Sequence, residues 1–141
     1  MKNLIYLIVL LSFYGHAQTS PEENEITAII EYIENTQQAQ IFEVQNTQKQ
    51  NDKGDDVITT YYYDEENIFC IIQKEFNDSQ RETTYYMQNN DLKLVIIKDV
   101  SPGKEIYYFV KDGEVLNTEN LDADYSFEET VIQLQQLIED F

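Results

Sequence analysis

The sequence predicts an α+β fold, in which an antiparallel meander of about six strands is flanked by an N-terminal and a C-terminal helix packed on one face. Apolar residues recur with helical spacing near both ends of the 141-residue chain, and strand-forming residues alternate between those ends. The predicted strands are joined by short links, whereas parallel strands need crossovers of about a dozen residues or more. The sheet is therefore expected to be antiparallel, with its strands in sequence order.

The first 17 residues have the pattern of a secretory signal peptide. Lys2 precedes an apolar run at 4–13, and the small residues Gly15 and Ala17 follow it. The run is too short to span a bilayer. Removal of this segment would leave a single α+β domain, 18–141, without a histidine. We therefore expect an exported, soluble protein of the periplasm or the extracellular space.

Both predicted helices begin at the same kind of signal. Ser20 and Ser126 are each followed three residues later by a glutamate, which is the spacing of a capping box. Pro21 stands at the first helical position, where its missing N–H costs nothing. The first helix is expected to fade between residues 35 and 40. Each helix carries one apolar stripe: Ile26, Ile29, Ile30 and Ile33 on the first, and Val131, Leu134, Leu137 and Ile138 on the second.

The residues between the helices are rich in Val, Ile, Thr, Tyr and Phe and alternate with period two. Turn-forming residues separate the runs. The middle also repeats at an offset of 24 residues, because the Thr-Thr-Tyr-Tyr segment 59–62 recurs at 83–86. We interpret this repeat as a sign of successive hairpins. The predicted strands are approximately 41–48, 57–64, 68–76, 82–88, 92–99 and 105–111, with a short seventh at 114–117.

Three tyrosine pairs lie in the predicted strands. Successive side chains of a strand point to opposite faces, so one ring of each pair would face away from the helices if both helices cover one face. Tyrosine is enriched at recognition surfaces, which favours a binding role. The alternative is that the rings form cross-strand pairs that only stabilise the sheet. The candidate binding residues, of which about half should be partly exposed, are Tyr61, Tyr62, Tyr85, Tyr86, Tyr107 and Tyr108.

The composition excludes most common catalytic and metal chemistry. Without histidine the mature chain lacks Ser-His-Asp, Cys-His and histidine-ligated zinc sites. The single cysteine, Cys70, excludes an intrachain disulfide and is expected to be a buried packing residue. Two acidic segments, 52–56 and 120–124, do not match an EF-hand. We therefore expect no enzymatic activity, no cofactor and no metal site.

The net charge of the chain disfavours some classes of binding partner. The chain has 27 acidic and 9 basic residues, a formal net charge of −18, which disfavours nucleic acids and anionic membrane surfaces. The preferred hypothesis is an exported binding module that uses its tyrosine-rich sheet face for a protein or small-molecule ligand. A second hypothesis is an acidic inhibitor or immunity-type protein that neutralises a basic extracytoplasmic enzyme. A third is a structural homodimer without a ligand.

Overall fold

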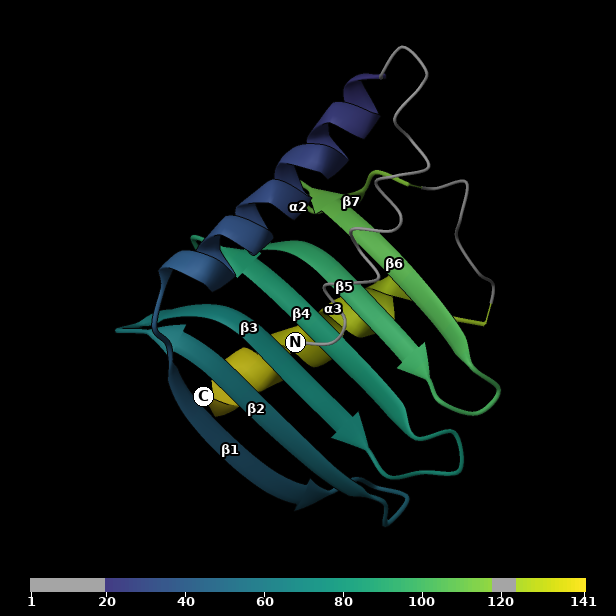
Figure 1. Ribbon diagram of the computed structural model, residues 1–141. Coiled ribbons are helices and arrows are strands. Elements are labelled where there is room, and N and C mark those ends of the chain that lie inside the picture. The colour runs from purple at the N-terminus through teal and green to yellow at the C-terminus, as the bar shows by residue number, and fades with distance from the viewer. Residues whose placement is uncertain (1–19, 118–123) are drawn as a thin grey trace. The chain divides into compact units, whose positions relative to one another are not determined.

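The computed structural model describes residues 20–117 and 124–141, which form two helices and a seven-stranded sheet (Figure 1). The strands are antiparallel and follow one another in sequence order. The predicted α+β fold with an antiparallel meander is thereby confirmed. The elements are α2 Pro21–Ala39, β1 Glu43–Gln50, β2 Asp56–Asp64, β3 Asn67–Glu75, β4 Arg81–Gln88, β5 Asp91–Asp99, β6 Lys104–Lys111, β7 Glu114–Val115 and α3 Phe127–Asp140.

The chain divides into two compact units, Met1–Ile41 and Phe42–Phe141. Helix α2 belongs to the first unit, and the sheet and α3 belong to the second. That 18–141 forms one domain, and that α2 shares a sheet face with α3, remain predictions. The predicted signal peptide, 1–17, lies outside the described residues.

Helix α2 begins with the predicted capping box. The Ser20 hydroxyl accepts from the N–H of Glu23 at 3.2 Å, and the Glu23 carboxylate accepts from the N–H of Ser20 at 2.9 Å. Ile29, Ile30 and Ile33 of the predicted stripe are buried. The helix continues to Ala39, so it extends through the segment in which it was expected to fade.

Two hairpins close with turns that their sequences explain. Asn89 and Asn90 link β4 to β5 with φ of 51° and 66°, and Asp112 and Gly113 link β6 to β7 with φ of 51° and 80°. A type I′ turn needs positive φ at both central residues, and Asn, Asp and Gly reach this region most easily. These turns set the register that pairs Gln88 with Asp91.

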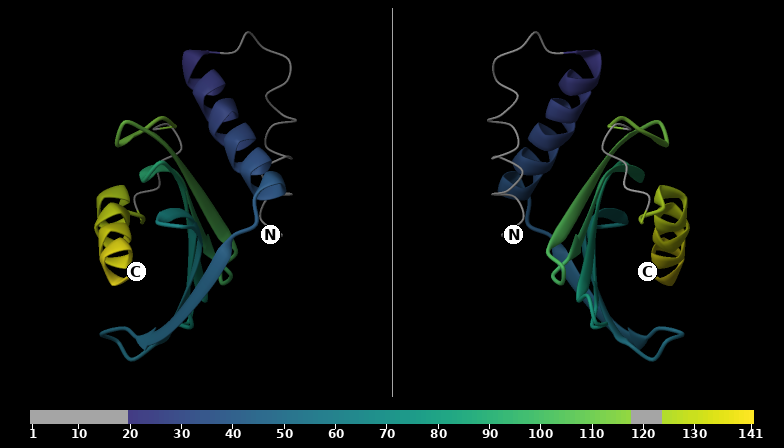
Figure 2. Two further views of the ribbon diagram at one scale, coloured as in Figure 1. Left: turned by 90° about the vertical axis from the view of Figure 1, so that its left-hand side faces the viewer. Right: turned by 90° about the vertical axis from the view of Figure 1, so that its right-hand side faces the viewer.

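The 24-residue repeat corresponds to a repeated irregularity in the sheet. The register shifts after Tyr62 in the β2–β3 pair and again after Tyr86 in the β4–β5 pair. Each shift leaves one residue unpaired, Phe69 in the first hairpin and Lys93 in the second. An extra residue of this kind bends the strand and increases its twist. The edge-on views show a curved sheet with α3 on its concave side (Figure 2).

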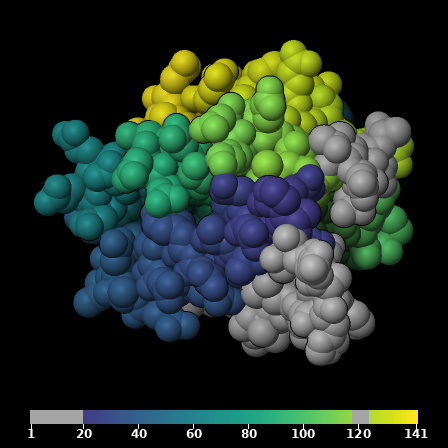
Figure 3. All heavy atoms as spheres, turned by 90° about the horizontal axis from the view of Figure 1, so that it is seen from above, coloured from purple at the N-terminus to yellow at the C-terminus, as the bar shows by residue number. Residues whose placement is uncertain are grey.

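Helix α3 packs against this concave side. The hydroxyl of its N-cap, Ser126, accepts from the N–H of Glu129 at 3.2 Å, and Lys49 of β1 binds Asp140 near the other end at 2.8 Å. In the space-filling view, atoms of α3 adjoin those of the strands (Figure 3). The helix contributes two leucines to the core cluster, which comprises Tyr61, Ile68, Ile71, Tyr85, Met87, Val95, Ile97, Ile106, Tyr108, Val110, Leu134 and Leu137.

Candidate functional site

The two tyrosines of each predicted pair lie on opposite faces of the sheet. We call the face covered by α3 the inner face and the opposite one the outer face. Tyr61, Tyr85 and Tyr108 belong to the core cluster on the inner face. Their neighbours Tyr62, Tyr86 and Tyr107 therefore lie on the outer face, because side chains alternate along a strand.

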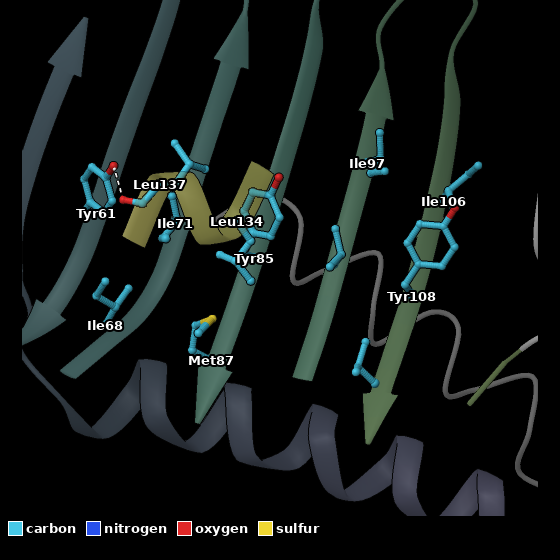
Figure 4. Close-up of a cluster of buried hydrophobic side chains, with 12 residues drawn as sticks. Tyr61, Ile68, Ile71, Tyr85, Met87, Ile97, Ile106, Tyr108, Leu134 and Leu137 are labelled. Carbon is cyan, nitrogen blue, oxygen red and sulfur yellow. Dashed lines mark hydrogen bonds between the residues drawn. The ribbon is translucent and has the colours of Figure 1, made fainter. Parts of the chain in front are cut away.

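The three inner tyrosines stand in one row across the sheet. Tyr61 pairs with Ile71, Ile71 with Tyr85, Tyr85 with Val95, and Val95 with Tyr108. All three rings are at most 1% exposed. Figure 4 shows them in one row across the sheet, with α3 behind the strands near Tyr61 and Tyr85. These residues of the predicted binding set are therefore core residues, and their rings are closed off from the surface.

Two of the inner hydroxyls tie the sheet to the chain around α3. The Tyr61 hydroxyl donates to the carbonyl of Leu137 at 2.9 Å (Figure 4), and the Tyr108 hydroxyl donates to the carbonyl of Tyr125 at 3.2 Å. The first bond satisfies a carbonyl in the last turn of the helix, where intrahelical donors are lacking. The tyrosine row thus positions both ends of α3.

Tyr85 differs from the other two, because its buried hydroxyl has no hydrogen-bond partner among the described residues. Burial raises the pKa of this hydroxyl, so it stays neutral. An unsatisfied buried hydroxyl costs about 1–3 kcal/mol of desolvation.

Removing single hydroxyls should therefore have opposite effects at two positions in the same row. We expect Tyr85→Phe to leave the free energy of unfolding unchanged or raise it by up to about 1 kcal/mol. We expect Tyr61→Phe to lower it by about 1 kcal/mol, because the Leu137 carbonyl loses its donor. Urea unfolding of both variants measures the difference. Equal destabilisation by the two changes would show that the Tyr85 hydroxyl has a partner after all.

The outer tyrosines are not equally accessible. Tyr86 is 6% exposed, and its ring meets that of Phe69 at 5.8 Å between centroids. Tyr62 and Tyr107 are partly exposed, and the Tyr107 hydroxyl donates to Glu105 at 2.7 Å. Two of the six candidate rings are thus partly exposed, where the sequence suggested about half. They belong to β2 and β6, four strand spacings or about 19 Å apart, so the six tyrosines do not form one surface.

Tyr62 lies among apolar side chains of β1, β2 and β3 that are also accessible. Val44 pairs with Tyr62 and is 52% exposed. Ile58 and Ile72 of the same face are partly exposed, and Thr60, which pairs with Ile72, donates to Asn46 at 2.7 Å. We call Val44, Ile58, Tyr62 and Ile72 the outer patch. An aromatic ring with aliphatic neighbours and a polar rim is typical of interaction surfaces.

Acidic residues lie at both ends of the strands that carry the outer patch. Asp64, Glu65 and Glu66 are exposed in the turn between β2 and β3, and Asp52 and Asp56 are exposed at the opposite ends of β1 and β2. Such a distribution attracts positively charged molecules and repels phosphates.

A buried carboxylate on the inner face was not predicted from the sequence. Asp99 is 4% exposed and accepts two bonds from the Arg81 guanidinium, at 2.8 and 2.9 Å. The hydroxyl of Tyr125 also donates to Asp99. The guanidinium carbon of Arg81 lies 4.9 Å from the centroid of the Tyr125 ring, and the ammonium nitrogen of Lys104 lies 5.1 Å from it. We call these four residues the Asp99 cluster.

The strand register brings the Asp99 cluster together. Asp99 pairs with Arg81 on one side and with Lys104 on the other. The hydrogen bond from Arg81 is the main cause that holds the pKa of Asp99 below its usual range. The Asp99 carboxylate accepts the Tyr125 hydroxyl and so holds Tyr125 beside the N-cap of α3. We therefore assign the Asp99 cluster a structural role. The only sequence signal was an arginine and an aspartate 18 residues apart.

Cys70 is buried, and burial raises the pKa of its thiol. This position agrees with the packing role expected from the apolar run around it. Over residues 20–117 and 124–141, no group of three or more His, Cys, Asp or Glu side chains is arranged to hold a metal ion. In the same part of the chain, no helix has the length and apolar character needed to cross a membrane.

No protein-family model, curated protein or solved structure matches this chain.

Proposed function

We propose that this protein is an exported, non-enzymatic binding module that holds a partner protein through the outer patch. The observation that carries the proposal is the accessible, contiguous set of Val44, Ile58, Tyr62 and Ile72 on the sheet face opposite α3. Export is supported by the signal-peptide pattern at 1–17. A non-enzymatic role is supported by the buried thiol and by a sequence whose single histidine, His16, lies in that segment.

The chemistry of the patch and of its surroundings defines the partner. Aliphatic side chains and one tyrosine ring favour an apolar contact, which salt does not weaken. The acidic residues at the strand ends favour a partner with positive charge around that contact. We therefore expect a basic protein with an exposed apolar spot.

A matched pair of substitutions tests the outer patch. We expect Tyr62→Ser to abolish capture of the partner from an envelope extract at high salt, because Tyr62 is the aromatic residue of the outer patch and tyrosine is enriched among the residues that dominate binding energy. Tyr107→Ser is the control, since it makes the same change on the same face about 19 Å away and should leave capture unchanged. Mass spectrometry of the eluates measures the difference. If the partner is retained by Tyr62→Ser, or if both variants lose it equally, the outer patch is not the contact surface.

The second candidate is an acidic inhibitor of a basic enzyme. It is favoured by the formal net charge of −18 and by the exposed turn Asp64, Glu65 and Glu66. Binding through carboxylates weakens steeply with salt, whereas binding through the outer patch does not. A partner that is captured at low salt, lost at high salt and insensitive to Tyr62→Ser would favour the inhibitor.

A further inference from the structure

The two edges of the sheet are built differently. At the β7 edge, the Asn117 side chain accepts from the N–H of Phe109 and donates to the carbonyl of Tyr107, and the N–H of Leu116 donates to the carbonyl of Phe109. The strand β7 itself has two residues. The backbone of β6 at Tyr107 and Phe109 is thus covered by side-chain and main-chain bonds beyond the short strand.

The β1 edge is long and regular. Its eight residues pair with β2 in an unbroken register, from Glu43 with Tyr63 to Gln50 with Asp56. The strand contains no proline and no bulge, two of the devices that proteins use to block an edge, although it carries one lysine, Lys49. No other described strand pairs with β1, so alternate residues direct their N–H and C=O groups away from the sheet.

Exposed apolar side chains lie beside the β1 edge on both faces. Val44 of the outer face is 52% exposed. On the inner face, Phe141 is 38% exposed, and its ring lies 4.9 Å from that of Tyr63 on the adjacent strand. A strand added to this edge would cover part of the Val44 side chain and part of the Phe141 side chain.

We infer that the β1 edge pairs antiparallel with the β1 edge of a second copy of this chain. Two identical strands that pair in this way are related by a two-fold axis perpendicular to the sheet, so both inner faces point the same way. Residues directly opposite one another must then lie on the same face, which restricts the register to pairs of odd with odd or even with even numbers.

One of these registers matches opposite charges twice. With Asn46 on the two-fold axis, Glu43 of each copy lies opposite Lys49 of the other, and Val44 lies opposite Gln48. Both charged residues are exposed. Lys49 already binds Asp140 at 2.8 Å, so the dimer would place this ammonium group between two carboxylates. In the symmetric registers shifted by one residue pair in either direction, Glu43 and Lys49 no longer lie opposite each other. The two charge pairs therefore favour the register centred on Asn46.

The second copy is favoured over an unrelated strand because the sequence of β1 complements itself. The pairing also brings the outer patches of the two copies next to each other, since Val44 lies in the strand at the interface. The inference does not depend on the proposed partner of that patch.

Charge reversal at the two positions tests the dimer directly. Light scattering and sedimentation of the wild-type protein at about 0.15 M salt, where the net charge is screened beyond about 8 Å, should show a monomer–dimer equilibrium. Glu43→Lys and Lys49→Glu should each raise the dimer dissociation constant about tenfold or more, because each places like charges opposite one another twice. A mixture of the two variants should restore dimers, since each strand then meets one of opposite sign.

Two controls separate the interface from other effects. Glu114→Lys makes the same change of charge on β7 and should leave the dissociation constant unchanged. Glu43→Lys keeps the Lys49–Asp140 bond, so it tests the interface even if Lys49→Glu proves less stable. A wild-type protein that stays monomeric from about 1 µM to 1 mM would overturn the inference, as would a dimer unaffected by either reversal. The Tyr62→Ser test is independent, so either proposal can fail alone.

Discussion

Replacing Arg81 with alanine is expected to lower the free energy of unfolding by about 2–3 kcal/mol at neutral pH. The change leaves Asp99, whose side chain is 6% exposed, without the two bonds from the guanidinium. Breaking a buried ion pair from one side costs about 3–5 kcal/mol, and the partial exposure of Arg81 reduces that cost. Urea unfolding at pH 7 measures the effect.

The destabilisation by Arg81→Ala should shrink as the pH falls. The bonds from Arg81 hold the pKa of Asp99 below its usual range. A carboxyl group whose pKa is lower in the folded state stabilises the protein above its unfolded pKa of about 3.9 and loses that contribution as pH falls through the folded value. The wild-type and variant curves should therefore converge below pH 4. A difference that stays constant down to pH 2 would show that the charge of Asp99 is not responsible.

An exposed ion pair on the other face provides the matched control. Lys74 lies 3.5 Å from Glu82, and its side chain is 53% exposed. Lys74→Ala should change the free energy of unfolding by less than about 1 kcal/mol, because exposed pairs contribute little. If both alanine variants were equally destabilised, burial of Asp99 would not explain the effect of Arg81.

The replacement of Leu134 with alanine is expected to cost about 3 kcal/mol of stability. Leu134 is 4% exposed and belongs to the core cluster between α3 and the sheet. Truncating a buried leucine removes its transfer free energy and leaves a cavity, which together cost about 2–5 kcal/mol. Thermal and urea unfolding measure the change.

Ile132 on the same helix is the control for this substitution. It is 57% exposed, so Ile132→Ala should cost less than about 0.5 kcal/mol. Both changes put alanine in α3, so helix propensity contributes similarly small amounts to each. If the two variants lost similar free energies of unfolding, burial of Leu134 in the core cluster would not explain its contribution to stability.

The local elements could be predicted because their signals are local. The Ser20 capping box, Leu134 and Leu137 of the predicted α3 stripe, and the Asn89–Asn90 turn each depend on a few neighbouring residues. Ile138 of the predicted stripe is 40% exposed. The limits of all seven strands agree with the sequence to within about two residues, including β7, which ends two residues earlier than expected. The length of α2 was underestimated, because the polar segment before Ala39 resembles a link.

The accessible part of the candidate binding set could not be predicted from any single segment of the sequence. Alternation predicts that Tyr61 and Tyr62 point to opposite faces, but it does not predict which ring α3 covers. The packing of Leu134 and Leu137 decides this, and it places Tyr61, Tyr85 and Tyr108 in the core. The outer patch needs the pairing of β1, β2 and β3, since its four residues come from three strands.

By itself, the sequence determined the class of this protein: its helices, its antiparallel strands in order and its acidity. Only the tertiary structure decided which tyrosines are core residues, that Arg81 and Asp99 form a buried pair, and that β1 is an open edge. The physical reason is that capping, periodicity and turn formation are interactions between near neighbours in the chain. Burial and cross-strand pairing join residues that are distant in sequence, and their outcome depends on how all the strands and α3 pack together.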